Sequence, residues 1–499
     1  MKAQIEVNAH RALGVRNVMI YGHFIEHFHR QIYGGIYQPG HKLSNEAGYR
    51  TDVIDALKNI NVPVMRWPGG CFVSNYNWKE GISINRVPFF DKAWRVEESN
   101  QFGTDEFVDY SQQIGAEPYI CTNAGTGTAE DMSDWVEYCN LENEGKWASL
   151  RISNGNIEPY NVKYWSIGNE NYGDWEIGAK SLNEWGRFVA ESAKMMKRVD
   201  PSIELFAASI PDLDWNINLI REAGKYLDWI SIHGYWDVLN EENNLSDFET
   251  CMAYTLDIEP PILQTKYILG SLGYLDKIRI SFDEWNLRGW HHPHVNSSTE
   301  DYLSPRDLND ANESYTMADA IFSACFLNQC LKHCDIVQMA NFSPTVNTRG
   351  AIFTHEDGIV LRSTYFVFQL YTTYMGDEVI DSYVSGGDTF RVDKKGITVE
   401  VPSLDVITTR HSLTGDIAIA IVNRHPNEAK ECELNIRQYD RTKITLYSLQ
   451  SDSKDAYNDI DNPTRVSIKE QQLTVNRQPH LISVPPHSVN MVYLTRNNS

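Results

Sequence analysis

The sequence has too few basic residues for a protein that binds nucleic acid. Its 44 lysines and arginines stand against 67 aspartates and glutamates, which gives a formal net charge of -23. Affinity for nucleic acid comes largely from Lys and Arg side chains that neutralise phosphates, so we expect no nucleic-acid partner. The acidic residues are scattered along the chain, a pattern typical of a solvated surface that identifies no substrate.

Long apolar runs are also missing. Residues 1–7 lack the apolar centre of a signal peptide, and no window approaches the uninterrupted apolar span of about 18 residues that crosses a membrane. The eight cysteines form no CxxC pair and lie mostly inside apolar patterns, as free thiols in a reducing compartment do. We therefore expect a cytoplasmic protein with no membrane partner.

The first three quarters of the sequence alternate short β-rich runs with helical patterns, which indicates parallel βαβ units. No GxGxxG phosphate turn follows the first run, so an open dinucleotide-binding sheet is disfavoured. Eight repeats predict a (β/α)8 TIM barrel, with strands at 17–24, 62–68, 117–123, 162–169, 204–210, 227–235, 277–286 and 335–342. Helical spacing occurs, for example, at 49–60, 104–114, 129–139, 181–199, 248–275 and 313–334.

Beyond about residue 380 the pattern changes to short strands separated by turn residues, without helices between them. These strands are predicted at 398–401, 417–423, 432–436, 443–448, 472–475 and 488–494. They favour a C-terminal all-β sandwich of jelly-roll type. The first 16 residues are also strand-like, so we predict a catalytic barrel over 17–380 and a sandwich formed by 1–16 and 381–499.

Two predicted barrel strands end in a glutamate beside an amide and close to an aromatic residue. Gly168-Asn169-Glu170 ends the fourth strand, and Asp283-Glu284-Trp285-Asn286 ends the seventh. Active sites of such barrels lie at the carboxyl ends of the strands, where these two ends face each other. Glycosidic cleavage needs two opposed carboxylates, about 5–5.5 Å apart for retention of configuration and further apart for inversion. A single glutamate would more often form an ion pair; two in matched settings favour catalysis.

The motifs resemble glycoside hydrolase family 51, the retaining α-L-arabinofuranosidases of clan A. The resemblance runs in order through residues 22–27 (GHFIEH), 66–72 (RWPGGCF), 168–170 (GNE), 231–235 (SIHGY) and 283–286 (DEWN). It implies that Glu170 is the general acid/base and Glu284 the nucleophile. It also implies the barrel with its C-terminal sandwich, and a homo-oligomer, either a trimer or a hexamer.

The resemblance further implies a set of substrate-binding residues: Glu26, Arg66, Cys71, Trp94, Asn169, Tyr235 and Asn341. In that set, Asn169 and Glu26 contact sugar hydroxyls, Tyr235 orients the nucleophile and Arg66 steadies a catalytic carboxylate. Cys71 forms a pocket wall, Trp94 a substrate subsite, and Asn341 a sugar contact where some relatives place Gln.

Five of these residues have a structural alternative. Glu26 could pair with Arg30, Arg66 could form a structural ion pair, and Asn169 could cap a turn. Tyr235 and Trp94 could serve packing alone.

Three histidines after the seventh predicted strand raise the question of a metal site. His291, His292 and His294 lie close together, but Pro293 interrupts the spacing that zinc ligands need. We interpret this loop as a wall of the pocket and expect no metal and no cofactor.

The leading hypothesis is an exo-acting α-L-arabinofuranosidase that removes terminal arabinofuranose from imported oligosaccharides of arabinan or arabinoxylan, the hemicellulose chains. A β-xylosidase or endo-β-glucanase would use the same two-glutamate mechanism. A non-catalytic carbohydrate-binding protein on the same fold is the alternative from another class.

Overall fold

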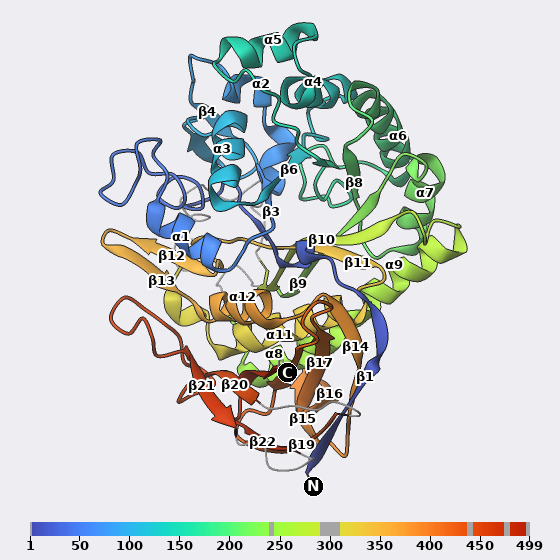
Figure 1. The fold of residues 1–499 in the computed structure, drawn as a ribbon. Coiled ribbons are helices and arrows are strands. Elements are labelled where there is room, and N and C mark those ends of the chain that lie inside the picture. The colour runs from blue at the N-terminus through green and yellow to red at the C-terminus, as the bar shows by residue number, and fades with distance from the viewer. Residues whose placement is uncertain (1, 239–243, 290–309, 437–442, 474–479, 496–499) are drawn as a thin grey trace.

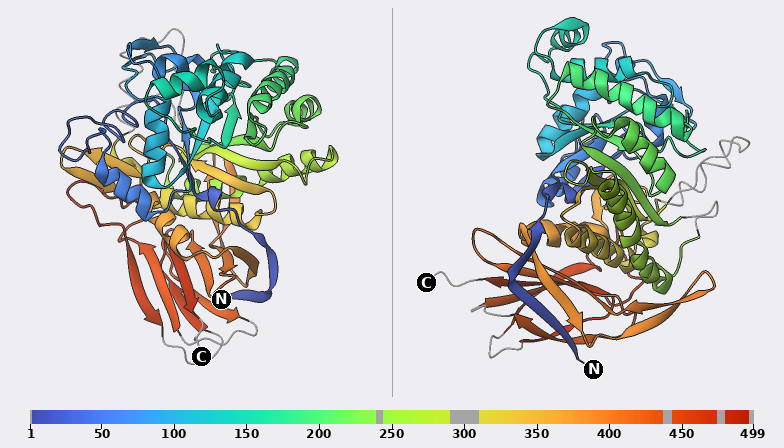
Figure 2. Two further views of the ribbon diagram at one scale, coloured as in Figure 1. Left: turned by 45° about the horizontal axis from the view of Figure 1, so that its top comes forward. Right: turned by 90° about the vertical axis from the view of Figure 1, so that its right-hand side faces the viewer.

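Eight parallel strands close into a barrel in the computed structural model, which describes residues 2–238, 244–289, 310–436, 443–473 and 480–495 (Figures 1 and 2). Around the barrel the strands follow chain order: β2 (Gly22–Phe24), β3 (Val64–Trp67), β6 (Glu117–Thr122), β7 (Tyr164–Ile167), β8 (Glu204–Ala208), β9 (Trp229–Asp237), β10 (Arg279–Arg288) and β11 (Val337–Phe342). Each coincides with one of the eight predicted strands, and the predicted TIM barrel is confirmed.

The first barrel strand is shorter than predicted. The side chain of Asn17 accepts a hydrogen bond from the backbone N–H of Met19 at 3.0 Å and caps a 3-10 helix, η1 (Val18–Tyr21). Because this cap turns the chain, only Gly22–Phe24 remain extended.

Helices cover the outside of the barrel: α1 (Thr51–Asn59), α3 (Thr104–Ile114), α4 (Ala129–Asn140), α6 (Leu182–Val199), α7 (Leu213–Ala223), α8 (Phe248–Tyr254), α9 (Glu259–Ser271), α11 (Met317–Lys332) and α12 (Ser363–Tyr374). The helix predicted over 248–275 is broken at η3 (Thr255–Asp257). Pro260 and Pro261 follow in the first turn of α9, where their missing N–H groups are tolerated. Sequence periodicity missed α7, α12 and the outlying α5 (Gly145–Ser153).

Several shorter elements lie between barrel strands. They are η2 (Cys71–Asn75), α2 (Trp78–Gly81), β4 (Phe89–Asp91), β5 (Val96–Glu98), η4 (Asn312–Ser314), β12 (Ile352–His355) and β13 (Gly358–Leu361). No helix in the described ranges is both long and apolar enough to cross a membrane.

Side chains fill the barrel interior at the amino-terminal ends of the strands. One buried cluster combines residues from six different strands, all from the amino-terminal halves or centres of those strands: Val64, Tyr119, Tyr164, Phe206, Trp229 and Met339. Since this layer fills the barrel at the amino-terminal ends of its strands, a ligand site is expected at the carboxyl ends.

The C-terminal part forms a nine-stranded sheet beneath the barrel in the view of Figure 1. Its order is β21 (Ser467–Leu473), β20 (Lys443–Gln450), β23 (Ser488–Thr495), β18 (Ile417–Asn423), β17 (Leu404–Arg410), β14 (Glu378–Ser385), β1 (Ala3–Val15), β19 (Lys430–Ile436) and β22 (His480–Val484). The hairpin of β15 (Thr389–Lys394) and β16 (Ile397–Pro402) is a separate two-stranded sheet. The N-terminal strand β1 pairs antiparallel with β14 and parallel with β19.

The alternation along β18 explains how this sheet docks. Ile417, Ile419 and Ile421 lie in one core with residues of β1, β19 and β22, so the sheet folds over on itself as a sandwich. Ala418 and Ala420 face the other way, into the larger core that includes α11. Small side chains on that face let the helix approach the sheet closely.

Candidate active site

A cavity of about 340 Å³ opens at the carboxyl ends of the barrel strands. Its size is within the range of small-molecule sites. The residues that line it come from the ends of six strands and the loops after them: Glu26, Phe28, Gly70, Cys71, Trp94, Glu170, Tyr172, Trp175, His233, Tyr235, Val238, Glu284, Gly289, Ser343 and Arg349.

Glu284 enters this cavity through an irregularity in β10. The register of β10 against β9 shifts between Phe282 and Glu284, as it does at a β-bulge. Consequently two consecutive acidic residues both face the barrel interior. Asp283 accepts a hydrogen bond from the Tyr119 hydroxyl at 2.6 Å within the filled layer, and Glu284 reaches the cavity above it.

The carboxylate of Glu284 is held by a cation and a hydroxyl. Arg66 donates from Nη1 to Oε1 at 2.6 Å, and the Tyr235 hydroxyl lies 2.8 Å from Oε2. Arg66 also donates from Nη2 to Oδ1 of Asn169 at 2.9 Å. These hydrogen bonds fix the orientation of the Glu284 carboxylate at the cavity.

Glu170 faces Glu284 from the loop after β7. Its φ of 26° lies in the left-handed region, which costs free energy for a residue with a side chain. Oε1 lies 2.8 Å from Nδ1 of His233, and Oε2 accepts from Nε1 of Trp175 at 2.7 Å. One carboxylate oxygen of Glu170, one of Glu284 and a ring nitrogen of His233 all lie within 4.8 Å of one another. The two glutamates therefore converge on one point.

His233 lies between the two carboxylates. Burial on its own lowers the pKa of the imidazole, but the charge of Glu284 and the hydrogen bond with Glu170 outweigh burial and raise this pKa overall. Nδ1 is 3.7 Å from Oε2 of Glu284. His233 can thus hold a proton beside both glutamates.

Glu26 and Trp94 form another side of the cavity. Oε1 of Glu26 accepts from Nε1 of Trp94 at 2.9 Å and from the backbone N–H of Phe72 at 3.0 Å. Arg30 instead donates to the carbonyl oxygen of Thr354, so the alternative pairing with Glu26 is not what the structure shows. Burial, reinforced by the charge of Glu284, raises the pKa of Glu26 to about 8. A protonated Glu26 can donate to a hydroxyl as well as accept from one.

The wall between these groups is made of glycine and cysteine. A Cβ atom at Gly70 would lie 3.0 Å from Oε1 of Glu284, so the absence of a side chain lets the backbone approach the carboxylate. Burial, with the charges of Glu176 and Glu170, raises the pKa of the Cys71 thiol well above its usual value. Cys71 is therefore a thiol, consistent with a pocket wall and not with a nucleophile.

Three of the predicted site residues do not line the cavity: Arg66, Asn169 and Asn341. Arg66 is buried behind it and bonds both Glu284 and Asn169. Asn341 lies deeper in the barrel. It is fully buried, and its Oδ1 would lie 2.4 Å from a Cβ atom at Gly22, its neighbour on β2. The reason is its position on β11, which directs the side chain into the barrel one layer below the pocket. Ser343, two residues later on the same face, lines the cavity instead.

Several residues of the cavity were not predicted. His233 could have been found, since it lies two residues before Tyr235 and must share its face of β9. Trp175, Ser343 and Arg349 lie beyond strand ends, where no periodicity fixes the direction of a side chain.

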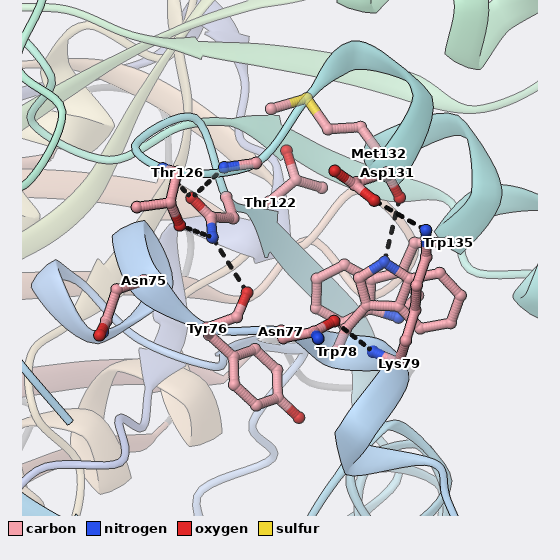
Figure 3. A pocket seen from close by; sticks show the side chains of 12 residues that line it. Asn75, Tyr76, Asn77, Trp78, Lys79, Thr122, Thr126, Asp131, Met132 and Trp135 are labelled. Carbon is pink, nitrogen blue, oxygen red and sulfur yellow. Dashed lines mark hydrogen bonds and ion pairs between the residues drawn. The ribbon is translucent and has the colours of Figure 1, made fainter. Parts of the chain in front are cut away.

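A second cavity, of about 310 Å³, lies between α2 and the loop that connects β6 to α4 (Figure 3). Its polar groups bind one another: Asn123 donates to Oγ1 of Thr126 at 3.0 Å, and Lys79 pairs with Asp131 at 2.7 Å. The residues that line it, all in the described part of the chain, include none of the predicted site residues. The candidate catalytic residues therefore belong to the first cavity.

We expect Tyr235→Phe to lower kcat/KM for a glycoside roughly 10- to 100-fold, because it removes a hydrogen bond to a charged group worth about 1.5–3 kcal/mol. Tyr371→Phe is the matched control: its hydroxyl bonds Oδ1 of Asn328 at 2.6 Å, and neither residue lines the cavity. The measurement is initial-rate kinetics with purified variants. Equal rates for both variants would show that Tyr235 does not orient Glu284.

The barrel and the convergent glutamates at its mouth define a glycoside hydrolase that works with two carboxylates. Residues 56–251 match the family model of the α-L-arabinofuranosidase 1 domain, and residues 283–488 match that of the α-L-arabinofuranosidase C-terminal domain. The chain belongs to the α-L-arabinofuranosidases of glycoside hydrolase family 51.

Individual relatives cover nearly the whole chain. The sequence is 34% identical to the intracellular exo-α-(1→5)-L-arabinofuranosidase of Halalkalibacterium halodurans, over 88% of each chain. The solved family 51 α-L-arabinofuranosidase of Thermotoga petrophila is 35% identical, with a TM-score of 0.88 over 98% of this chain and 99% of that one. The arabinose complex of the Thermotoga maritima enzyme is 34% identical, with a TM-score of 0.87 over 99% and 100%. The similarity thus spans both the barrel and the C-terminal sheet.

Proposed function

We propose that this protein is a retaining exo-α-L-arabinofuranosidase with Glu284 as nucleophile and Glu170 as general acid/base. The observation that carries the proposal is the approach of the two glutamates, whose nearest carboxylate oxygens lie within 4.8 Å. This agrees with the separation of about 5–5.5 Å used for retention and is shorter than the gap of about 6.5–9.5 Å that inversion needs.

The first step forms a glycosyl-enzyme. An oxygen of Glu284 attacks the anomeric carbon while Glu170 gives its proton to the glycosidic oxygen, so that the bond to the leaving group breaks. Arg66 and Tyr235 hold the attacking carboxylate. Asn169 and Glu26 bind the hydroxyls of the sugar ring, as the family resemblance implies.

The second step releases the sugar. Glu170, now ionised, takes a proton from a water molecule whose oxygen attacks the anomeric carbon, and the ester bond to Glu284 breaks. Two displacements restore the original configuration. His233 and Trp175 hold Glu170 in place through both steps.

The proposed substrates are arabinofuranose-containing oligosaccharides of arabinan or arabinoxylan. The Halalkalibacterium relative is named as an intracellular enzyme with exo action on α-(1→5) linkages, which supports exo action and a place inside the cell. Assembly as a trimer or hexamer remains part of the proposal and rests on the family resemblance.

The hydrolysis of aryl glycosides shows which sugar the enzyme accepts. We expect aryl α-L-arabinofuranoside to be hydrolysed with a kcat/KM on the order of 10²-fold or more above that for aryl β-D-xyloside, and cellulose to be left intact. Turnover of the xyloside or of cellulose, without turnover of the arabinofuranoside, would leave the two-glutamate mechanism in place. It would change the assigned substrate to that glycoside. Binding of arabinose without turnover of any glycoside would identify a non-catalytic carbohydrate-binding protein.

A further inference from the structure

A fourth carboxyl group, besides those of Glu26, Glu170 and Glu284, lies directly behind the pocket wall, at Glu176 in the loop between β7 and α6. The residue is 4% exposed and does not line the cavity. An oxygen of its carboxyl group, the Sγ atom of Cys71 and a carboxylate oxygen of Glu170 lie within 4.8 Å of one another. Glu176 is therefore close to the reacting groups without being exposed to the substrate.

One contact of Glu176 acts on Asn169. The Asn169 amide accepts from Arg66 at Oδ1 and faces Oε2 of Glu176 with Nδ2 at 3.5 Å. Because the two ends of the amide have different partners, its orientation is fixed. Nδ2 would lie 3.6 Å from a Cβ atom at Gly70, which places the donor end at the cavity wall.

The other contacts of Glu176 act on η2. Its Oε1 accepts from the Ser74 hydroxyl, and a hydrogen bond links its carboxyl group to Cys71. On the far side, the carbonyl oxygen of Ser74 accepts from the backbone N–H of Thr126 at 3.0 Å. Through these hydrogen bonds Glu176 connects the segment that contains Cys71 with the segment that contains Asn169 and Glu170.

The groups that face Glu176 determine its charge. Burial is the largest effect on the pKa of Glu176 and raises it, as do the charges of Glu170 and Glu26. The hydrogen bonds from Cys71 and Ser74 lower this pKa but do not outweigh burial. Together these effects raise the pKa of Glu176 to about 8. Lys180, on the same loop, donates to the carbonyl oxygens of Ala124 and Gly178. Near neutral pH the carboxyl group is therefore protonated.

We propose that Glu176 is a positioning residue that works in its uncharged form, holding the Asn169 amide and the Cys71 wall around the sugar site, and that its ionisation limits activity at alkaline pH. The proposal rests on the proposed function of this site. The physical reason is that a further negative charge beside Glu170 and Glu26 repels both and disturbs the wall that Glu176 holds together.

The variant Glu176→Gln separates charge from hydrogen bonding. A glutamine, like a protonated glutamate, offers one acceptor and a donor in the same place, but it cannot ionise. At about pH 6 we expect kcat and KM on an aryl α-L-arabinofuranoside within about threefold of the wild type. At about pH 9 the variant should be more active than the wild type, with the alkaline limb of kcat/KM displaced upward by about one pH unit or more.

Glu176→Ala removes the contacts themselves. We expect it to lower kcat/KM on the order of 10- to 100-fold at every pH, as small displacements of a site do. The matched control is Glu191→Gln, an exposed glutamate of α6 paired with Lys194 and outside the cavity. If the alanine variant fails to fold, the glutamine variant still decides the question.

Thermal unfolding gives a readout independent of activity. A carboxyl group whose pKa is raised in the folded state stabilises the fold fully below its ordinary value of 4.5, and this stability is lost as the pH rises through about 8. The melting temperature of Glu176→Gln, relative to the wild type, should therefore rise between about pH 5 and pH 9. Glu191→Gln should show no such trend.

The outcomes separate this proposal from the proposed function. If another glycoside is the substrate, the pH profiles are measured on that glycoside, and the melting comparison is unaffected. A purely structural role predicts parallel profiles for the wild type and Glu176→Gln. Superimposable alkaline limbs together with a melting difference that does not change with pH would overturn the proposal.

Discussion

Glu284→Gln is expected to lower kcat on the order of 10⁴-fold or more, which corresponds to about 5.5 kcal/mol of transition-state free energy. The amide occupies nearly the same volume and keeps a contact for the Tyr235 hydroxyl, but its oxygen is too weak a nucleophile to form the glycosyl-enzyme. The effect should appear on every substrate, including aryl glycosides with good leaving groups, because the nucleophile is needed whatever departs.

The substitution also removes the partner of a buried cation. Arg66 loses its ion pair with Glu284, and the only other carboxylate within 4.0 Å of its guanidinium, in the described ranges, is Asp283 at 4.0 Å from Nε. An unpaired buried charge destabilises a fold, so the melting temperature is measured alongside kcat. Glu259→Gln, which breaks a pairing with Lys332 away from the cavity, is the control. Activity of Glu284→Gln within about tenfold of the wild type would exclude Glu284 as nucleophile.

The barrel could be predicted from the sequence because its strands are buried on both faces and separated by amphipathic helices. The errors have local causes. Asn17 caps a 3-10 helix where an extended start was expected. The strand predicted at 472–475 is β21, Ser467–Leu473, and residues 474–475 lie outside the described ranges. β21 is an edge strand whose central residues are exposed, so it has no buried face to reveal it.

Strand positions alone made the candidate site predictable only at strand ends, whereas Cys71 and Trp94, which lie in the connections after β3 and also line the cavity, came from the family resemblance. Glu170, Tyr235 and Glu284 follow or end strands, where the barrel dictates that they meet. Trp175 and Glu176 follow Glu170 in an irregular loop that folds back against the pocket. No periodicity or motif in the sequence predicts the path of this loop.

The interpretation of the loop histidines and the domain boundaries also stay predictions, like the roles of the site residues and the oligomeric state. The loop histidines His291, His292 and His294 lie outside the described residues, so their assignment to a pocket wall is untested. The boundaries of the barrel and sandwich domains, at 17–380 and at 1–16 with 381–499, are likewise untested.

Glu170→Ala should lower kcat/KM by an amount that depends on the leaving group of the substrate. The proton of the general acid matters most when the departing oxygen is a poor leaving group, as in an oligosaccharide, where we expect kcat/KM to fall by about 10²- to 10⁴-fold. A dinitrophenyl α-L-arabinofuranoside needs little protonation, so its kcat/KM should stay within about tenfold. Its kcat should still fall, since the glycosyl-enzyme now lacks a base to activate water and accumulates.

Azide distinguishes loss of the base from general damage to the pocket, where His233 and Trp175 also lose their partner in Glu170. As an anion it needs no base, so it can attack the anomeric carbon of the glycosyl-enzyme, break the ester bond to Glu284 and restore turnover. Because Glu284 blocks one face of the sugar, the product should be the arabinofuranosyl azide with the configuration of the substrate. An azide product of opposite configuration would refute retention, and equal losses on both leaving groups without rescue would refute the role of Glu170.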